Sequence, residues 1–167
     1  AGDYVLVRRF TAKEEKRRLV ASLISVADVP APAYAFENHL NYFHEAGQPL
    51  DPDLAKGLAV FLNSSLADAY FRQFNGHTQV NATDLRNLRY PERESLIRMG
   101  RELGSQSLDT VTADTILDAL FLAMPDANSR DPILVRKKID DALDLLEQLD
   151  VPRAQRNESS ALTLLAL

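Results

Sequence analysis

The chain has 167 residues, 46% of them hydrophobic and 26% charged, a composition that favours one sizeable packed domain or two small ones and excludes disorder throughout. Cysteine is absent, which excludes a disulfide framework and a thiolate zinc site, and we expect a reducing, cytoplasmic location. The net charge of −5 comes from residues 105–167, which carry 6 basic and 11 acidic side chains, whereas residues 1–104 carry 13 of each.

Three strands are predicted in the first part of the chain. Residues 4–10 are rich in β-branched and aromatic side chains, and residues 17–25 give a second strand after the charged connector 11–16. These two strands would form a hairpin with a basic tip. After a break at residues 30–32, residues 34–44 alternate apolar and polar side chains, which predicts the third strand.

A long helix is predicted next. Asp51 or Asp53 can cap its start, and apolar side chains recur near helical spacing until about Phe74. Asn75 and Gly76 end the helix, because both residues tolerate the left-handed conformation of a helix C-terminus.

Polar groups crowd residues 76–88, between apolar segments, and folding alone does not explain their density. Residues 79–81 predict a short extended piece. Thr83 or Asp84 can cap a turn after it, and Pro91 stops that turn. We therefore expect a loop that is pinned at both ends.

From residue 91 onward the pattern is helical. We expect helices at about residues 92–103, 112–123 and 132–149, and another that starts near residue 157 or 158. The helix over 132–149 is strongly amphipathic and has Pro132 at its first position, so one of its faces must be buried.

The expected fold class is α+β. A small antiparallel sheet and a long helix would form most of a first domain, residues 1–104. A mostly helical domain, residues 105–167, would follow it, with the boundary at the Gly- and Ser-rich stretch 104–107.

Positive charge clusters twice in the first domain and could meet phosphate. The first cluster comprises Arg8, Arg9, Lys13, Lys16, Arg17 and Arg18, and the second comprises Arg86, Arg89, Arg93, Arg98 and Arg101. Neighbouring side chains of a strand point to opposite faces, so only one of Arg8 and Arg9 would face a DNA backbone, and Glu14 and Glu15 dilute the patch. The alternative interpretation of both clusters is a solvated face.

Two amides in the polar loop suit the edge of a base. Gln79 and Asn81 each offer a donor and an acceptor for adenine, and on an extended segment they would share a face. The alternative is that both amides satisfy backbone groups of the loop. Thr83 and Asp84 are interpreted as helix caps.

Other loop side chains could contact either bases or backbone. His77 and Thr78 can reach a base or a phosphate, and Arg86 or Arg89 suits guanine or phosphate.

The sequence offers no catalytic or metal-binding constellation. His39, His44 and His77 match no compact ligand spacing. Ser64 and Ser65 lack the glycine elbow of a hydrolase nucleophile, and no motif pairs two carboxylates as acid and base. Most aromatic side chains fall on apolar faces and are interpreted as core.

The chain is expected to be a piece of a longer protein, since it begins with Ala1 rather than Met and stops inside the apolar run 161–167. No apolar run approaches the roughly 20 residues of a membrane span, and no signal segment opens the chain, so we expect no membrane partner.

Four ordered blocks carry a family resemblance that covers about residues 1–95. They are Tyr4 to Phe10, Lys13 to Val20, Phe36 to Tyr42 and Gly76 to Arg86. Together they resemble the target-recognition region of type II restriction-modification DNA methyltransferases that act on adenine N6.

The resemblance implies that a preceding domain binds S-adenosylmethionine and methylates adenine, while this region grips double-stranded DNA and reads the site. Such a domain needs a glycine-bearing cofactor loop and an Asn/Asp-Pro-Pro-Tyr/Phe segment that holds the flipped adenine, and this sequence contains neither. We therefore expect no methyl transfer, no catalytic residue and no bound cofactor in this chain alone.

A second, shorter resemblance lies at the end of the chain. Residues 143–149, followed by residues 151–167, resemble the start of PstI-like restriction endonucleases. This implies an N-terminal helical DNA-binding region without the nuclease residues. A methylase that continues into such a module and a fused methylase-endonuclease are both compatible with it.

The leading hypothesis is DNA target recognition for an adenine methyltransferase. The alternative is a protein-protein interaction or dimerisation module, in which the acidic helical half docks onto a partner subunit or a second copy. The candidate DNA contacts are Arg8, Arg9, Lys13, Lys16, Arg17, Arg18, His77, Thr78, Gln79, Asn81, Arg86 and Arg89.

Overall fold

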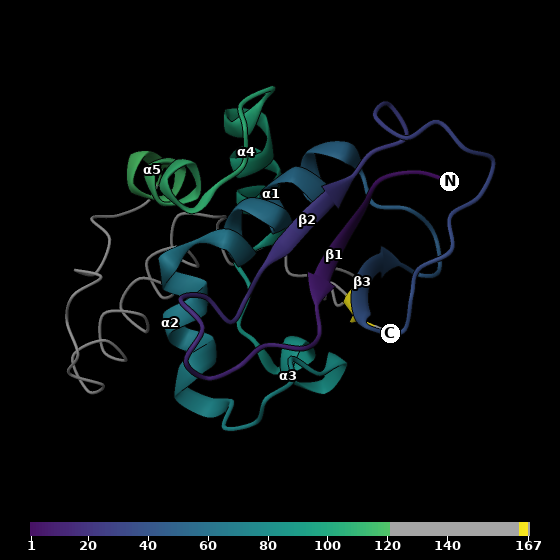
Figure 1. Ribbon diagram of the computed structural model, residues 1–167. Helices are drawn as coiled ribbons and strands as arrows, with labels where there is room; N and C mark the ends of the chain where they lie inside the picture. Colours follow the sequence, from purple (N-terminus) through teal and green to yellow (C-terminus); the bar gives the residue numbers. More distant parts are fainter. Residues whose placement is uncertain (121–163, 167) are drawn as a thin grey trace, which may run out of the picture.

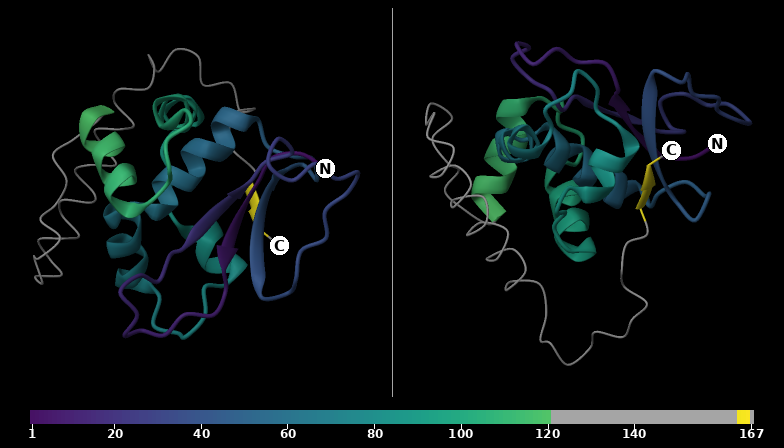
Figure 2. Two further views of the ribbon diagram at one scale, coloured as in Figure 1. Left: turned by 45° about the horizontal axis from the view of Figure 1, so that its top comes forward. Right: turned by 90° about the horizontal axis from the view of Figure 1, so that it is seen from below.

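Four strands and five helices make up the part of the chain that the computed structural model describes, residues 1–120 and 164–166. In chain order they are β1 (Tyr4–Arg8), β2 (Ala21–Ile24), β3 (Leu40–Glu45), α1 (Pro52–Asn63), α2 (Ser65–Phe74), α3 (Ala82–Asn87), α4 (Arg93–Leu103), α5 (Thr110–Leu120) and β4 (Leu164–Ala166). The fold is α+β, as predicted, and the helices gather on one face of the sheet (Figure 1, Figure 2).

The strands pair in the order β2-β1-β3-β4, and every pairing is antiparallel. Strand β1 places Val5 opposite Leu23 of β2 and Phe43 of β3. Val5, Val7 and Phe43 are buried on the face that meets the helices, because successive side chains of a strand alternate between faces. The predicted hairpin of the first two strands is confirmed.

Strand β2 begins at Ala21, later than the predicted start at residue 17. The backbone N–H groups of Arg18 and Leu19 both donate to Asp68 Oδ1 of α2, each at 2.7 Å. The N–H groups of residues 18 and 19 therefore bond to a side chain and not to a neighbouring strand, a competition that the sequence pattern does not reveal.

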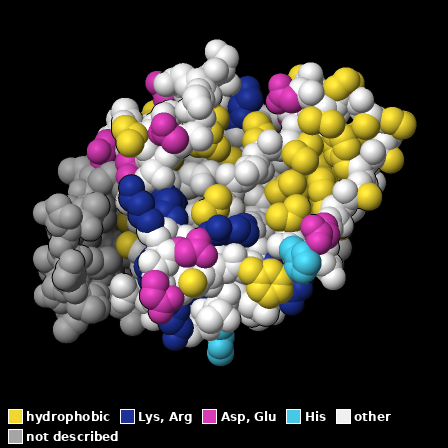
Figure 3. Space-filling view, viewed as in Figure 1, with side chains coloured by type: hydrophobic (Ala, Val, Ile, Leu, Met, Phe, Trp, Pro, Cys, Tyr) yellow, Lys and Arg dark blue, Asp and Glu magenta, His cyan; other side chains and the backbone are white. Residues whose placement is uncertain are grey.

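Strand β3 begins at Leu40, so residues 34–39 of the predicted strand lie outside the ladder. Tyr34 and Phe36 pack edge-on against Tyr4, with ring centroids 6.0 and 5.4 Å away. The alternation that predicted a strand therefore arises from aromatic side chains that pack beside the outer face of the sheet. Hydrophobic side chains form a visible area there (Figure 3).

The predicted helix to Phe74 is two helices, separated at Ser64. Ser64 has extended dihedrals, and its hydroxyl donates to the Phe61 carbonyl of α1 at 2.6 Å. The same hydroxyl oxygen accepts from the Ala67 N–H of α2 at 3.1 Å. Ser64 thus closes one helix and caps the next, as short polar side chains do at helix starts.

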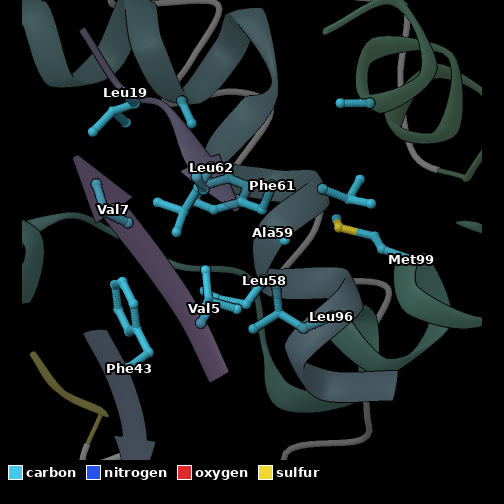
Figure 4. Close-up of a cluster of buried hydrophobic side chains, with 14 of the residues drawn as sticks. Val5, Val7, Leu19, Phe43, Leu58, Ala59, Phe61, Leu62, Leu96 and Met99 are labelled. Carbon is cyan, nitrogen blue, oxygen red and sulfur yellow. The ribbon is translucent and has the colours of Figure 1, made fainter. Parts of the chain in front are cut away.

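The core lies between the sheet and α1 and continues between α1 and α4 (Figure 4). Residues 57–64 are all buried, because α1 has the sheet on one side and α4 and α5 on the other. A helix that is covered on both sides loses the polar face of a surface helix. None of the described helices is long and apolar enough to cross a membrane.

Two glycines bring α1 and α4 into backbone contact. A Cβ atom at Gly57 would lie 1.6 Å from the Leu96 carbonyl oxygen, and one at Gly100 would lie 1.9 Å from the Asp53 carbonyl oxygen. No side chain has room at either position, so the helix crossing requires glycine there.

The end of the described chain differs from the prediction in one place. Helices α4 and α5 confirm two predicted helices, and Ala113, Ile116 and Leu117 of α5 join the same buried cluster as α1. Where a helix from residue 157 was predicted, Leu164–Ala166 forms β4, because the open edge of β3 offers backbone groups for pairing.

The predicted helix over 132–149 lies outside the described residues. The predicted division into domains at residue 104 therefore stays a prediction.

We expect Gly57→Ala and Gly100→Ala each to lower the free energy of unfolding by about 2 kcal/mol or more. Overpacking costs about 1–3 kcal/mol, and here the clash is with backbone, so it outweighs the gain of about 1 kcal/mol from replacing glycine in a helix. Urea unfolding followed by circular dichroism measures the change. Gly76→Ala is the control, since nothing lies within 4 Å of a Cβ there. Equal stability of all three variants would contradict the backbone contact.

Candidate nucleic-acid interface

Two polar segments meet beyond one end of the sheet: the β1–β2 connection, residues 9–20, and the loop between α2 and α3, residues 75–81 (Figure 1). Thr11 N donates to the Thr78 carbonyl at 3.2 Å, and Val80 N donates to the Arg9 carbonyl at 2.7 Å. Phe10 and Gln79 form an antiparallel bridge. The loop is therefore laid against the continuation of β1.

Side chains from the interior hold the backbone of this loop. Asn75 Nδ2 donates to the Gln79 carbonyl at 3.1 Å, and Asn75 Oδ1 accepts from His77 N at 3.2 Å. The buried Asn41 of β3 donates from Nδ2 to the Val80 carbonyl at 2.8 Å. The loop conformation is thus set through main-chain atoms. His77 and Thr78 are exposed, and Gln79 is half-buried.

Arg18 lies inside the protein, with 1% of its surface exposed. Its Nη2 donates to Asn75 Oδ1 at 2.8 Å and to the His77 carbonyl at 2.6 Å, and its Nε donates to Thr11 Oγ1 at 2.5 Å. Burial, together with the nearby Arg72 charge, lowers the pKa of its guanidinium, and Asp68 opposes this shift. Arg18 is oriented toward the loop backbone, so a phosphate outside cannot reach it in this arrangement.

Arg17 is also directed inward, toward the junction of α1 and α2. Its guanidinium donates to the carbonyl groups of Leu62, Asn63 and Ser64, and to Thr110 Oγ1 at 2.6 Å. These are carbonyls that the last turn of a helix leaves without partners. Burial lowers the pKa of Arg17, opposed by Asp68 and Asp114. Arg17 is half-buried, and its guanidinium group stabilises a helix end.

The connection between β1 and β2 is fixed through its own backbone. Arg72 of α2 donates to the carbonyls of Lys13, Glu15 and Lys16 and pairs with Asp68 at 2.7 Å. The side chains of Lys13 and Lys16 remain exposed. Figure 3 shows Lys and Arg side chains, with Asp and Glu among them, over this part of the surface.

Arg8 and Arg9 diverge, as neighbours on an extended backbone should. Arg8 forms an ion pair with Glu15. Arg9 donates to the Asn38 carbonyl at 3.3 Å. Glu15 also accepts from Ala12 N at 2.9 Å, and the hydrogen bonds from Ala12 and Arg8 lower the pKa of its carboxyl. The charge of Arg8 is therefore partly neutralised within the connection.

Helix α3 begins differently from the prediction. Asn81 is its N-cap residue, and Asp84, three residues on, accepts from Asn81 N at 3.0 Å. The helix thus begins at Asn81, ahead of the predicted caps; Asp84 contributes to the cap from the third helical position, and Thr83 lies inside the helix. Arg86 is exposed and Arg89 half-buried, and both have interaction partners within the protein.

The histidines do not converge. His39 pairs with Glu37 on the surface, and the buried His44 accepts from Gly47 N at 2.8 Å. Among the described residues, no three His, Asp or Glu side chains lie close enough together to hold a metal ion.

The sequence patterns did not reveal the buried and half-buried polar residues that hold this end of the molecule. Asn75 was interpreted only as a helix end, and Asn41, Asp68 and Arg72 received no role. The one available signal was the presence of polar side chains at positions where a helix or strand faces the core, since buried polar groups need partners.

Comparison with known proteins relates the chain to type II methyltransferases. It is 55% identical over 117 residues to type II methyltransferase M.PstI of Providencia stuartii, and the aligned segment is 70% of this chain and 23% of that protein. It is 45% identical over 123 residues to type II methyltransferase M.BsuBI of Bacillus subtilis, which covers 72% of this chain and 25% of that protein. The chain spans about a quarter of the length of these curated relatives.

No family model and no solved structure matches the chain. The two relatives establish that it is related to a region of type II methyltransferases. The resemblance of residues 143–167 to restriction endonucleases stays a prediction.

We expect Arg17→Ala to lower the free energy of unfolding by about 3 kcal/mol, because buried carbonyls at the end of α1 lose a charged donor. Arg17→Lys should recover only part of this loss, since an ammonium group lacks the planar fork. Lys16→Ala, next to it in sequence but exposed, should stay within about 0.5 kcal/mol of the wild type. If instead Arg17→Ala kept full stability and weakened DNA binding, Arg17 would be a phosphate contact.

Proposed function

We propose that this chain is a DNA target-recognition region of a type II adenine-N6 methyltransferase. The observation that carries the proposal is the end of the sheet where residues 11–16 and 75–81 lie together. Both segments are held by their backbones from within and leave polar side chains outside. The similarity to two type II methyltransferases supports the same function.

The exposed groups suit the two kinds of contact that DNA recognition needs. Lys13 and Lys16 are exposed cations that can neutralise phosphates, which gives affinity and register but no sequence information. His77, Thr78 and Gln79 lie on the adjacent loop, and the Gln79 amide matches the donor-acceptor pattern of adenine in the major groove. Arg17 and Arg18 have no place in this interface, because their guanidinium groups are engaged inside.

The remaining assignments follow from the family resemblance. Adenine would be methylated with S-adenosylmethionine on another part of a longer protein, and this chain alone would be inactive. The alternative, an interaction or dimerisation module, rests mainly on the predicted helix 132–149, which lies outside the described residues.

We expect the full-length gene product to bind duplex DNA with an affinity that falls steeply as salt increases. Lys13→Ala and Lys16→Ala should weaken binding to all duplexes alike, each reducing the salt slope by about 1. Gln79→Ala should instead cost about 1–3 kcal/mol of discrimination at one base pair. Fluorescence anisotropy at several salt concentrations measures both effects.

Lys56→Ala is the matched control for the two lysine variants. Lys56 lies on α1, and its ammonium group donates to the Gly104 carbonyl at the far end of α4. Absent or salt-insensitive binding by the wild type would overturn the proposed function. Equal loss in Lys56→Ala and Lys16→Ala would show that binding does not use this end of the sheet.

A further inference from the structure

We propose that Arg18 and Asn75 are positioning residues for sequence readout. They hold the backbone of residues 77–79 in the position from which its side chains contact the bases. The inference rests on the proposed function and goes beyond it, because neither residue is itself assigned to DNA. Both residues are buried, with 1% and 5% of their surfaces exposed.

A chain of hydrogen bonds connects Arg18, Asn75 and the backbone of His77. Arg18 Nη2 bonds Asn75 Oδ1 at 2.8 Å and also the His77 carbonyl at 2.6 Å. Asn75 Oδ1 accepts in addition from His77 N at 3.2 Å. Both polar backbone groups of His77 are thus held by this pair of side chains.

The amide nitrogen of Asn75 holds the remainder of the loop. Asn75 Nδ2 donates to the Gln79 carbonyl at 3.1 Å and to Asp84 Oδ2 at 2.8 Å. The same Asp84 oxygen accepts from Asn81 N, where α3 begins. One amide therefore links the loop at residues 77 and 79 with the start of the following helix.

The guanidinium group of Arg18 has a fixed direction. Nε bonds Thr11 Oγ1 at 2.5 Å, and the guanidinium carbon lies 5.6 Å from the centre of the Phe71 ring. A planar fork with donors in set directions can satisfy Thr11, Asn75 and His77 together, whereas a lysine ammonium group cannot. Arg18 thus links residue 77 directly to Thr11, beside the backbone bonds that join the loop to the continuation of β1.

The lysines of the interface are held by a separate set of contacts. Arg72 binds the carbonyls of residues 13, 15 and 16, and Asp68 binds the backbone of residues 18 and 19. Loss of the Asn75 side chain would therefore loosen the loop and leave Lys13 and Lys16 in place. Base contacts tolerate displacements of only about 0.5 Å, whereas attraction to phosphate is long-ranged. Loss of the Asn75 side chain should therefore lower discrimination between DNA sequences and leave the general affinity for DNA nearly unchanged.

The test measures the discrimination of the full-length gene product between two duplexes. One is the duplex that the wild type prefers in selection from a random-sequence pool, and the other differs from it by one base pair. The ratio is the dissociation constant for the second duplex divided by that for the preferred one. We expect Asn75→Ala to lower this ratio about ten-fold, the size of one lost base contact. Affinity for random-sequence DNA and the salt slope should stay within about two-fold of the wild type, since the phosphate contacts remain.

Asn63→Ala is the matched control, because Asn63 is another buried asparagine that bonds backbone, here Ala21 and Ala59. It should lose similar stability in urea and keep its discrimination. Thr11→Val is a milder second variant, which removes one acceptor of Arg18 and should lower the ratio about three-fold, the worth of one hydrogen bond.

A double variant gives the sharpest outcome. If Asn75 acts by placing Gln79, Gln79→Ala should cost little further discrimination in the Asn75→Ala background, because coupled residues are not additive. Unchanged discrimination in folded Asn75→Ala and Thr11→Val would overturn the inference and leave the proposed function standing. A wild type without any sequence preference would overturn both.

Discussion

A positive charge inside a protein is stable only where hydrogen-bond acceptors surround it, and Arg18 meets this requirement with main-chain and side-chain oxygens of two segments. Thr11 belongs to the connection after β1, Asn75 to the end of α2, and the His77 carbonyl to the following loop. Asn75 and His77 lie close together in sequence and Thr11 lies far from both, so hydrogen bonds to one guanidinium group join two segments that are distant in sequence. The arrangement of the whole polar end of the molecule depends on these hydrogen bonds.

The remainder of the fold is the support on which this end rests. α1 packs between the sheet and α4, and the backbones of α1 and α4 are in contact at Gly57 and Gly100. Ser64 then redirects the chain into α2, which carries Asp68 and Arg72 to the β1–β2 connection. Because the interior is close-packed, the position of one element fixes the positions of the elements packed against it. The apolar half therefore determines where the polar half can place its side chains.

Local patterns predicted the elements whose stability is local or strongly periodic: the first hairpin, the start of the long helix at Asp51, and α4. They could not predict the break at Ser64 or the late start of β3, because both depend on tertiary contacts. The same limit applies to the basic cluster. Lys16, Arg17 and Arg18 are adjacent and similar in sequence, yet one faces solvent and two are engaged inside, because Asn63 and Asn75 lie nearby only after folding.

The loop over residues 77–79 is held through its backbone carbonyl and N–H groups, which every residue except proline possesses. The side chains at these positions carry none of the bonds that fix the loop. A protein built in this way can exchange what it displays without redesigning what holds it. Closely related proteins can thus diverge in preference by changing a few loop side chains, and the same positions are natural ones to randomise when a new preference is sought.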